Sequence, residues 1–313
     1  MINELKNLKI LYLGTPEISA DTLSYLLEGG ANIVAVITNP DKPQGRKGME
    51  VPPPVKSLAL SKGIPVYQKA RIRDDYAFLD DIDFDILLTM AYGQILPVEI
   101  LNKAPLGAYN LHGSLLPEYR GAAPIQRAIM DNKKETGVTL MEMVAKMDAG
   151  KMFAKKVVEI GENDNYSSLC KKISKAAADL ALSSLLDVVN KVNLGEEQDE
   201  NLVTFAAKIG VDEERLDLNL PLNELYARIR GLSLTPGGHF ILNGLKLKVF
   251  KASIASNEQK GEIGEIVGVK KGIFVSVKGG VIRLEEVQLE GKKAMDAASF
   301  ANGMHNLLGS KLE

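Results

Sequence analysis

The feature that most constrains the fold is the alternation of short apolar runs with helical patterns over residues 1–190. The runs are nearly continuous in apolar residues, which is typical of strands buried on both faces. Buried strands that alternate with helices form parallel sheets covered by helices on both sides. The sequence therefore predicts an α/β fold with a doubly wound, mostly parallel sheet. The predicted strands lie at residues 9–13, 33–38, 65–67, 86–89 and 108–111.

The sequence pattern changes near residue 200. Residues 195–201 are acidic and poor in apolar side chains, which is typical of a linker. Short alternating strands follow after residue 207, and turn residues separate them at nearly even spacing. This pattern indicates a second, smaller domain, an antiparallel β-barrel of the OB-like kind. We predict a larger domain at residues 1–193, a linker at 194–207 and a barrel domain at 208–313.

Polar loops rich in glycine and proline follow several of the predicted strands. They lie at residues 14–16, 39–54, 91–97 and 112–121. Parallel sheets of this class bind ligands beyond the carboxyl ends of their strands, where such loops gather. We therefore expect these four segments to share one edge of the sheet and to form the binding site.

Three side chains near this edge have the chemistry of acyl transfer to an amine. Alternation along a strand places Asn110 and His112 on the same face, and Asp148 lies at a turn further along the chain. An amide or a protonated imidazole stabilises a developing oxyanion, and an imidazole moves protons between nitrogens. A nearby Asp148 carboxylate would orient the His112 ring. Taken one at a time, His112 and Asp148 would be ordinary core and turn residues, so the inference rests on the ordered set.

Composition narrows the possible classes of function. The net charge of −2 gives no overall basic signature, so any contact with RNA must come from local basic loops. The single cysteine, Cys170, excludes an intrachain disulfide and fits a reducing compartment. No apolar run approaches the roughly 18 residues of a membrane helix. We therefore predict a cytoplasmic protein with no membrane partner and no metal site.

Residues 110–126, which begin with Asn-Leu-His-Gly-Ser-Leu-Leu-Pro, form the most specific motif of the chain. With this motif the sequence resembles the methionyl-tRNA formyltransferase family, and the resemblance extends over nearly its whole length. Residues 13–16 resemble the first strand turn of that family, and residues 91–97 resemble its folate-side loop. Residues 40–46 and 52–56 resemble the borders of its substrate loop, and residues 291–295 its last barrel motif.

The resemblance implies the formyltransferase fold and a specific reaction. The formyl group of 10-formyltetrahydrofolate would pass to the α-amino group of methionine on initiator methionyl-tRNA, with Asn110, His112 and Asp148 as catalytic residues. We expect the enzyme to be a monomer. The implied folate-binding residues are Ser114, Leu115, Leu116, Pro117, Tyr92, Gly93, Gln94, Ile95, Leu96 and Pro97. The implied tRNA-binding residues are Lys42, Arg46 and Lys47, which make one loop locally basic.

Rival functions differ in how well the residues fit them. A folate-dependent formyltransferase for a small amine, such as glycinamide ribonucleotide or an amino sugar nucleotide, would use the same three residues and remains the alternative. A nucleotide-dependent dehydrogenase would need Gly-x-Gly-x-x-Gly after the first strand, where this chain has residues 14–19 without that pattern. A non-enzymatic RNA-binding protein would not need the catalytic set. One departure from the family is that the chain contains no tryptophan.

Overall fold

The computed structural model describes residues 1–44 and 48–313. The chain divides into two compact units, and neither unit is one unbroken stretch of sequence. None of the helices within the described residues combines the length and apolar character that a membrane crossing requires. The first unit consists of Met1–Gly121, Thr136–Glu159 and Cys170–Ala206. The second consists of Ala122–Glu135, Ile160–Leu169 and Ala207–Glu313.

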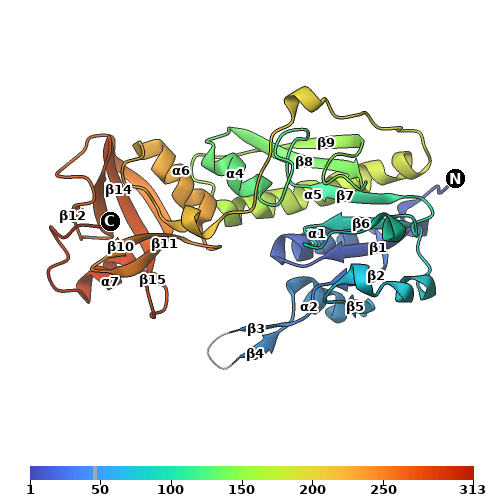
Figure 1. The fold of residues 1–313 in the computed structure, drawn as a ribbon, viewed down its shortest axis with the longest axis horizontal. Helices are drawn as coiled ribbons and strands as arrows, with labels where there is room; N and C mark the ends of the chain where they lie inside the picture. Colours follow the sequence, from blue (N-terminus) through green and yellow to red (C-terminus); the bar gives the residue numbers. More distant parts are fainter. Residues whose placement is uncertain (45–47) are drawn as a thin grey trace. The chain divides into compact units, whose positions relative to one another are not determined.

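The first unit is built on a seven-stranded sheet with the order β5-β2-β1-β6-β7-β8-β9 (Figure 1). Strands β5, β2, β1, β6 and β7 each pair in parallel with the next strand in this order. Strand β8 pairs antiparallel with β7. The predicted mostly parallel α/β sheet is confirmed. Its inner strands are mostly apolar and mostly buried, and β6 is buried along its whole length. The strands are β1 (Lys9–Gly14), β2 (Asn32–Thr38), β5 (Val66–Gln68), β6 (Ile86–Met90), β7 (Ala108–His112), β8 (Glu135–Glu142) and β9 (Met152–Glu159).

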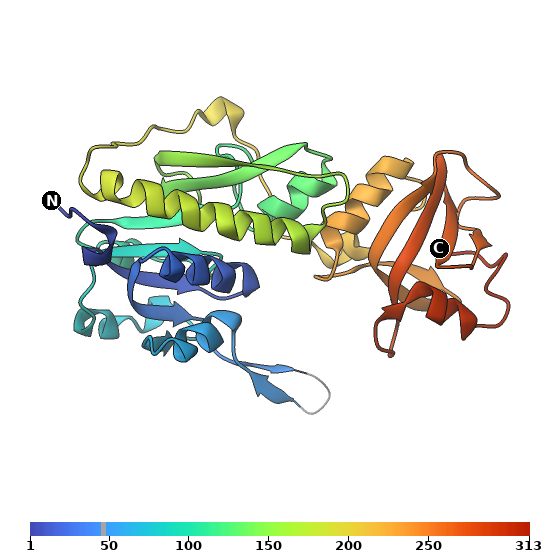
Figure 2. The same cartoon turned by 180° about the vertical axis from the view of Figure 1, so that it is seen from behind.

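Helical segments cover both faces of this sheet. On one face α1 (Glu17–Glu28) lies beside the long helix α5 (Tyr166–Val189), as Figure 2 shows. The Lys175 ammonium lies 5.7 Å from the centre of the Tyr25 ring across this contact. On the other face a core of buried apolar residues joins β1, β2 and β6 to short helices further along the chain. These short helices are η2 (Ile72–Asp74), η3 (Ala77–Asp81) and α3 (Val98–Leu101).

The proline- and glycine-rich loop after β2 contains a hairpin that the sequence pattern did not predict. Strand β3 (Lys42–Gln44) pairs antiparallel with β4 (Met49–Val51). Proline within strand β3 is compatible with this arrangement because a two-stranded ribbon leaves backbone groups on its outer side unpaired. The helix α2 (Pro54–Ser61) follows directly and begins with proline at its first position, where no amide hydrogen is needed.

After α5 the chain crosses back over the first unit as a return segment, residues 194–206, with little regular structure. Glu196 and Met152 exchange two backbone hydrogen bonds of 2.9 Å. Further along, the Arg120 amide donates to Thr204, and Arg120 accepts from the Ala206 amide at 2.7 Å. The return segment therefore lies against both β9 and the loop that follows β7. It contains one short turn, η4 (Glu200–Leu202).

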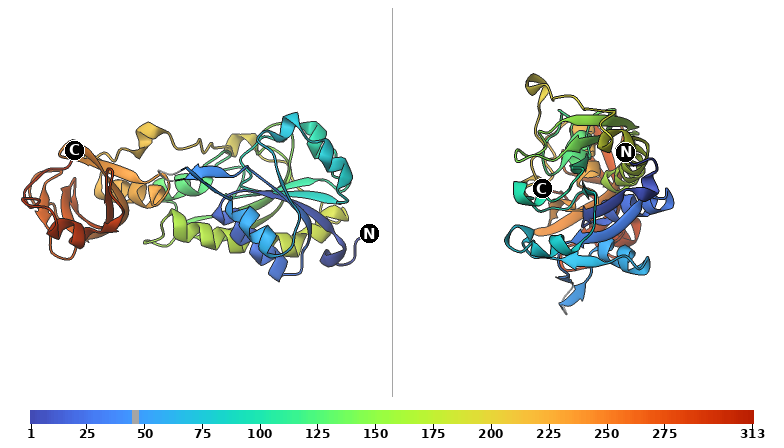
Figure 3. Two further views of the ribbon diagram at one scale, coloured as in Figure 1. Left: turned by 90° about the horizontal axis from the view of Figure 1, so that it is seen from below. Right: turned by 90° about the vertical axis from the view of Figure 1, so that its right-hand side faces the viewer.

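The second unit contains a six-stranded antiparallel sheet that curves into a barrel (Figure 3). The strand path is β10-β11-β14-β13-β12, and β15 pairs with β14. The C-terminal residues close the sheet, because Leu312 bridges to Leu242 in β10 and Lys311 bridges to Glu265 beside β12. The predicted antiparallel second domain is confirmed. The strands are β10 (Gly238–Leu242), β11 (Leu245–Ser256), β12 (Ile266–Gly268), β13 (Ile273–Val277), β14 (Gly280–Leu289) and β15 (Met295–Asp296).

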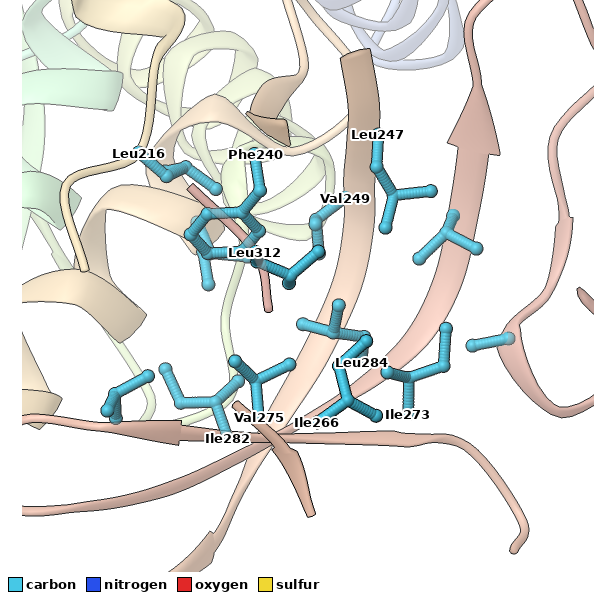
Figure 4. Close-up of a cluster of buried hydrophobic side chains, with 14 of the residues drawn as sticks. Leu216, Phe240, Leu247, Val249, Ile266, Ile273, Val275, Ile282, Leu284 and Leu312 are labelled. Atoms are coloured by element: carbon cyan, nitrogen blue, oxygen red, sulfur yellow. The ribbon is translucent and has the colours of Figure 1, made fainter. Parts of the chain in front are cut away.

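Apolar side chains from these strands point toward one another in a single core (Figure 4). Phe240, Val275 and Leu284 are among its fully buried members. Helix α6 packs against α4 so closely that a Cβ at Gly231 would lie 2.7 Å from Met130. A larger residue at position 231 would therefore force the Met130 side chain to shift. The helices of this unit are α4 (Pro124–Met130), η5 (Val211–Glu214), α6 (Leu222–Leu232) and α7 (Ala297–Asn302).

Candidate active site

The loops after β1, β2 and β6 are held together by side chains that bond to one another's backbone. The Thr15 hydroxyl donates to the Tyr92 carbonyl at 2.9 Å, and the Asn39 amide donates to the same carbonyl at 3.1 Å. The Gln94 amide donates to the Asn39 side-chain oxygen at 2.7 Å. Three of the four segments expected at this edge, those that contain Thr15, Asn39 and Gln94, are thus joined in one hydrogen-bonded framework.

Within residues 92–97 the side chains have different environments. Gln94 also accepts from the Ile72 amide at 2.9 Å, so both ends of its side chain are bonded. Leu96 is buried in the core. Tyr92 is buried too, and burial raises the pKa of its hydroxyl to about 12. Ile95 is 72% exposed and offers an apolar surface beside the polar framework. Gly93 adopts φ +86°, a conformation that favours glycine, and Pro97 precedes α3.

Asn110 is oriented by a neighbour on the adjacent strand. The register of β6 and β7 pairs Thr89 with Asn110, and the Thr89 hydroxyl donates to the Asn110 side-chain oxygen at 2.8 Å. Because the oxygen already accepts this bond, the amide hydrogens form the end of the side chain that is offered to a ligand. Asn110 therefore presents a donor at the carboxyl end of β7.

His112 is the last residue of β7 and is 5% exposed. Its Nε2 lies 2.9 Å from the Tyr119 carbonyl oxygen, and its Nδ1 lies 3.7 Å from Asp148 Oδ1. A carbonyl oxygen only accepts, so Nε2 carries the hydrogen in this contact. In the neutral ring Nδ1 is then the nitrogen that accepts a proton, and it faces the Asp148 carboxylate.

Asp148 lies in a turn whose backbone is held in the left-handed region, at φ +51°. One carboxylate oxygen accepts from the Gly121 amide at 2.8 Å, and the other faces His112. The turn needs glycine two residues later, because a Cβ at Gly150 would lie 2.1 Å from the Glu142 carbonyl oxygen. The spacing Asp-Ala-Gly is therefore a steric requirement of the turn.

The loop at residues 114–117 contributes mainly backbone to this edge. Ser114 is fully buried, and its hydroxyl donates to the Glu118 carbonyl at 2.6 Å. Leu116 is buried against two methionines of β8 and β9. Leu115 and Pro117 are half-buried, and the peptide bond between Leu116 and Pro117 is cis. The Ser114 hydroxyl, which was expected to contact folate, thus already donates a hydrogen bond within its own loop.

Of the three predicted tRNA-binding residues, the structure describes one. Lys42 is exposed on β3 of the hairpin. Arg46 and Lys47 lie outside the described residues.

Several groups that position the site were not predicted from the sequence. Thr89 had one detectable signal, a polar residue inside an apolar strand. The Tyr119 carbonyl and the Gly121 amide are backbone groups and have no side-chain signature. Gln198 lies in a stretch that reads as a linker, yet its amide donates to the Asp148 carbonyl at 2.8 Å.

Together these groups supply what acyl transfer between two nitrogens needs. The Asn110 amide can donate a hydrogen bond to an oxyanion, and His112 Nδ1 can exchange a proton. A carboxylate in the place of Asp148 can stabilise an imidazole that holds a proton. The gap of 3.7 Å between His112 and Asp148 is longer than a hydrogen bond, as catalytic contacts often are before a substrate binds.

The chain is similar to known proteins in sequence over both units. A formyl transferase family model matches residues 7–185, and a model of the formyl transferase C-terminal domain matches residues 208–305. A methionyl-tRNA formyltransferase from Bacillus licheniformis is 42% identical over 309 residues. The match covers 97% of this chain and 98% of that protein.

Two solved structures show the same fold at lower identity. HypX from Aquifex aeolicus, in complex with tetrahydrofolic acid, has a TM-score of 0.69 at 16% identity. That match covers 93% of this chain and 46% of HypX, so the chain spans about half of that protein's length. An N-formyltransferase from Helicobacter canadensis, in complex with folinic acid and dTDP-3-aminofucose, has a TM-score of 0.65 at 19% identity, covering 88% and 98% of the two chains.

Proposed function

The chain belongs to the methionyl-tRNA formyltransferase family, and from this premise we propose that Asn110, His112 and Asp148 carry out its formyl transfer. The supporting observation is that His112 Nδ1 faces Asp148 Oδ1 while Nε2 is held by a backbone carbonyl. This arrangement leaves a single ring nitrogen for proton exchange and places a carboxylate beside it.

The roles follow from the bonds that form and break. The amino nitrogen of methionyl-tRNA attacks the formyl carbon, and the carbonyl oxygen becomes an oxyanion that accepts from the Asn110 amide. His112 Nδ1, directly or through a water, takes the proton that the attacking nitrogen loses, and Asp148 stabilises the resulting imidazolium. The carbon–nitrogen bond to the donor then breaks, and the same proton passes to the leaving nitrogen. Protons and charges balance without a covalent enzyme intermediate.

We assign 10-formyltetrahydrofolate as the formyl donor. A structural neighbour is described in complex with tetrahydrofolic acid, which supports a folate site in this fold. The exposed Ile95 side chain and the bonded loop at residues 92–97 would contact the flat apolar rings of a folate, and the loop at residues 114–117 would line the other side through its backbone. This assignment makes the donor a cosubstrate that is consumed in each turnover.

We assign the basic residues that follow β2 in the sequence, Lys42, Arg46 and Lys47, to contacts with initiator methionyl-tRNA. Arginine and lysine bind phosphates, and arginine also reads base edges. Residues 1–193 would then form the catalytic domain and residues 208–313 the tRNA-binding barrel, joined through 194–207. We propose that the enzyme acts as a monomer in the cytoplasm.

The direct test is formyl transfer from 10-formyltetrahydrofolate to charged initiator tRNA, run beside glycinamide ribonucleotide and an amino sugar nucleotide. Transfer to the tRNA alone supports the assignment, whereas transfer to a small amine alone favours the alternative. The variant His112→Ala should lower kcat by about a hundredfold or more, because proton transfer and charge stabilisation are both lost. The exposed His305→Ala is the matched control and should keep normal turnover. Normal turnover of His112→Ala would contradict the catalytic role.

A further inference from the structure

The return segment has the composition of a linker, yet it forms hydrogen bonds with two backbone segments of the proposed site. These are residues 119–121, which hold His112 and Asp148, and residues 148–150, which form the turn of Asp148. The Tyr119 amide donates to the Thr204 hydroxyl at 2.8 Å, next to the carbonyl that holds His112. A Cβ at Gly121 would lie 2.6 Å from the Ala206 carbonyl oxygen, so the segment packs directly on the amide that binds Asp148.

Within the return segment, Gln198 bonds to the turn that contains Asp148, and this glutamine is 8% exposed. Its Nε2 donates to the Asp148 carbonyl at 2.8 Å and to the Gly150 carbonyl at 2.9 Å. These two carbonyls bracket the turn, and Asp148 itself has the left-handed φ of +51°. One amide group therefore ties both ends of a turn that an aspartate adopts only when its surroundings hold it.

Arg120 fixes which end of the Gln198 amide faces the turn. Its Nε donates to Gln198 Oε1 at 2.9 Å, and arginine has no acceptor. The oxygen of Gln198 must face Arg120, and its NH2 group must face the Asp148 and Gly150 carbonyls. Arg120 is 2% exposed, and its charge is balanced by Glu200, which accepts from Nη2 at 2.9 Å.

We propose that Gln198 is a positioning residue for formyl transfer, which acts by holding Asp148 toward His112. Arg120 supports it by setting the direction of its amide. The return segment is thereby part of the active-site framework and not only a connection between two domains. This inference rests on the proposed roles of His112 and Asp148, and it assigns Gln198 no contact with either substrate.

The test compares Gln198→Met with Asn193→Leu. Methionine keeps the approximate volume of glutamine and removes all of its hydrogen bonds. Asn193 is the matched control, because its amide donates to the Phe153 carbonyl at 2.7 Å in the same part of the unit without touching Asp148. We expect Gln198→Met to lower kcat between about 10-fold and 100-fold, since a small misplacement of a catalytic group has effects of this size. KM for folate and for tRNA should stay within about twofold.

A spectroscopic readout separates positioning from loss of structure. The chain has only three histidines, so the imidazole nitrogens of His112, His239 and His305 can be followed individually by nitrogen-15 NMR. In Gln198→Met the Nδ1 signal of His112 should move, while the signals of His239 and His305 should not. Gln198→Glu should behave like Gln198→Met or worse, because it places an acceptor against two carbonyls.

The outcomes divide clearly. Equal losses of kcat in Gln198→Met and Asn193→Leu, or an unmoved His112 signal, would overturn the positioning role. Normal turnover of Gln198→Met alongside a dead His112→Ala would overturn this inference and leave the proposed catalytic residues intact. Normal turnover of His112→Ala would instead remove the premise.

Discussion

At the scale of single residues, the proposed active site contains hydrogen bonds whose direction is fixed by their partners. The Tyr119 carbonyl assigns the hydrogen of His112 to Nε2, and Thr89 assigns the amide hydrogens of Asn110 to the ligand side. Neither side chain is then free to exchange donor and acceptor ends. Such fixed dipoles stabilise a transition state because they do not have to reorganise during the reaction.

Thr89→Val tests the orientation of Asn110. Valine keeps the shape of threonine and removes the hydroxyl that bonds to the Asn110 oxygen, so the amide would no longer be held. We expect kcat to fall by about tenfold, in line with the loss of one positioning contact. The free energy of unfolding should fall by about 1 kcal/mol, the typical net value of one buried hydrogen bond.

The control for this variant is Thr22→Val. The Thr22 hydroxyl is also buried and donates to the Ile18 carbonyl at 2.8 Å within α1. A similar loss of stability without a change in kcat is expected there. If both variants lost turnover equally, the effect of Thr89→Val would be one of stability and not of orientation.

The sequence allowed us to select candidate residues that contribute a side chain to the site. It did not allow us to select residues that contribute only a backbone amide or carbonyl. Asn110, His112 and Asp148 were selected from their order and spacing, and the structure brings His112 and Asp148 within 3.7 Å. The Gly121 amide that binds Asp148 was not predictable, because any residue has an amide. Gln198 was not predictable either, because its contact depends on the path of a segment without periodic pattern.

At the scale of secondary structure, periodicity predicted the elements that have a buried face. Strands β1, β2, β6 and β7 begin and end within about two residues of the predicted positions, because their apolar runs coincide with burial. The pairing of β3 with β4 was missed because β4 is exposed along its length and β3 contains Pro43, so no burial pattern marks either strand. The two strands pair through backbone hydrogen bonds, and the identity of their side chains does not indicate that pairing.

A test at this scale concerns α4 and η5, which are joined by a charged pair in the second unit. Arg127 Nη2 donates to Glu213 Oε1 at 2.8 Å, and the Gly210 amide donates to the same oxygen at 2.9 Å. The Arg127 guanidinium is the main cause that lowers the pKa of Glu213 to about 2. A carboxyl whose pKa is lower in the folded state stabilises the fold above its unfolded pKa of about 4.5. This stabilisation is lost as pH falls from 4.5 toward 2.

Glu213→Gln should therefore lower the free energy of unfolding at pH 7 by about 1–2 kcal/mol, a value reduced for the partial exposure of the pair. The difference from the unsubstituted protein should shrink as pH falls below 4.5 and approach zero near pH 2. Thermal unfolding at a series of pH values measures it. The neighbouring Glu214→Gln removes the same charge as a control, and a difference that stayed constant with pH would contradict the assignment.

At the scale of the whole molecule, the compact units do not follow the order of the chain. The functional division proposed at residues 194–207 is a separate matter from packing: residues through Ala206 cluster with the first unit, and Ala122–Glu135 and Ile160–Leu169 cluster with the second. The amino-acid composition of a segment indicates where helices and strands end. It does not indicate which surface an irregular segment packs against. An acidic stretch therefore resembled a linker even though its glutamine is buried.

The overall charge of −2 makes binding of a polyanion dependent on local cations. Each phosphate contact releases counterions, so the logarithm of the tRNA association constant should fall linearly with the logarithm of salt concentration, by about 0.7–0.9 per contact. Lys42→Ala and Arg46→Ala should each remove one phosphate contact and so lower the magnitude of this slope by about 0.7–0.9. Both variants should leave KM for folate unchanged. Lys62→Ala, which removes an exposed lysine at the end of α2, is the matched control and should keep the original slope. A binding constant insensitive to salt, or a slope that Lys62→Ala lowers as much as Lys42→Ala does, would mean that Lys42 and Arg46 do not bind the tRNA backbone.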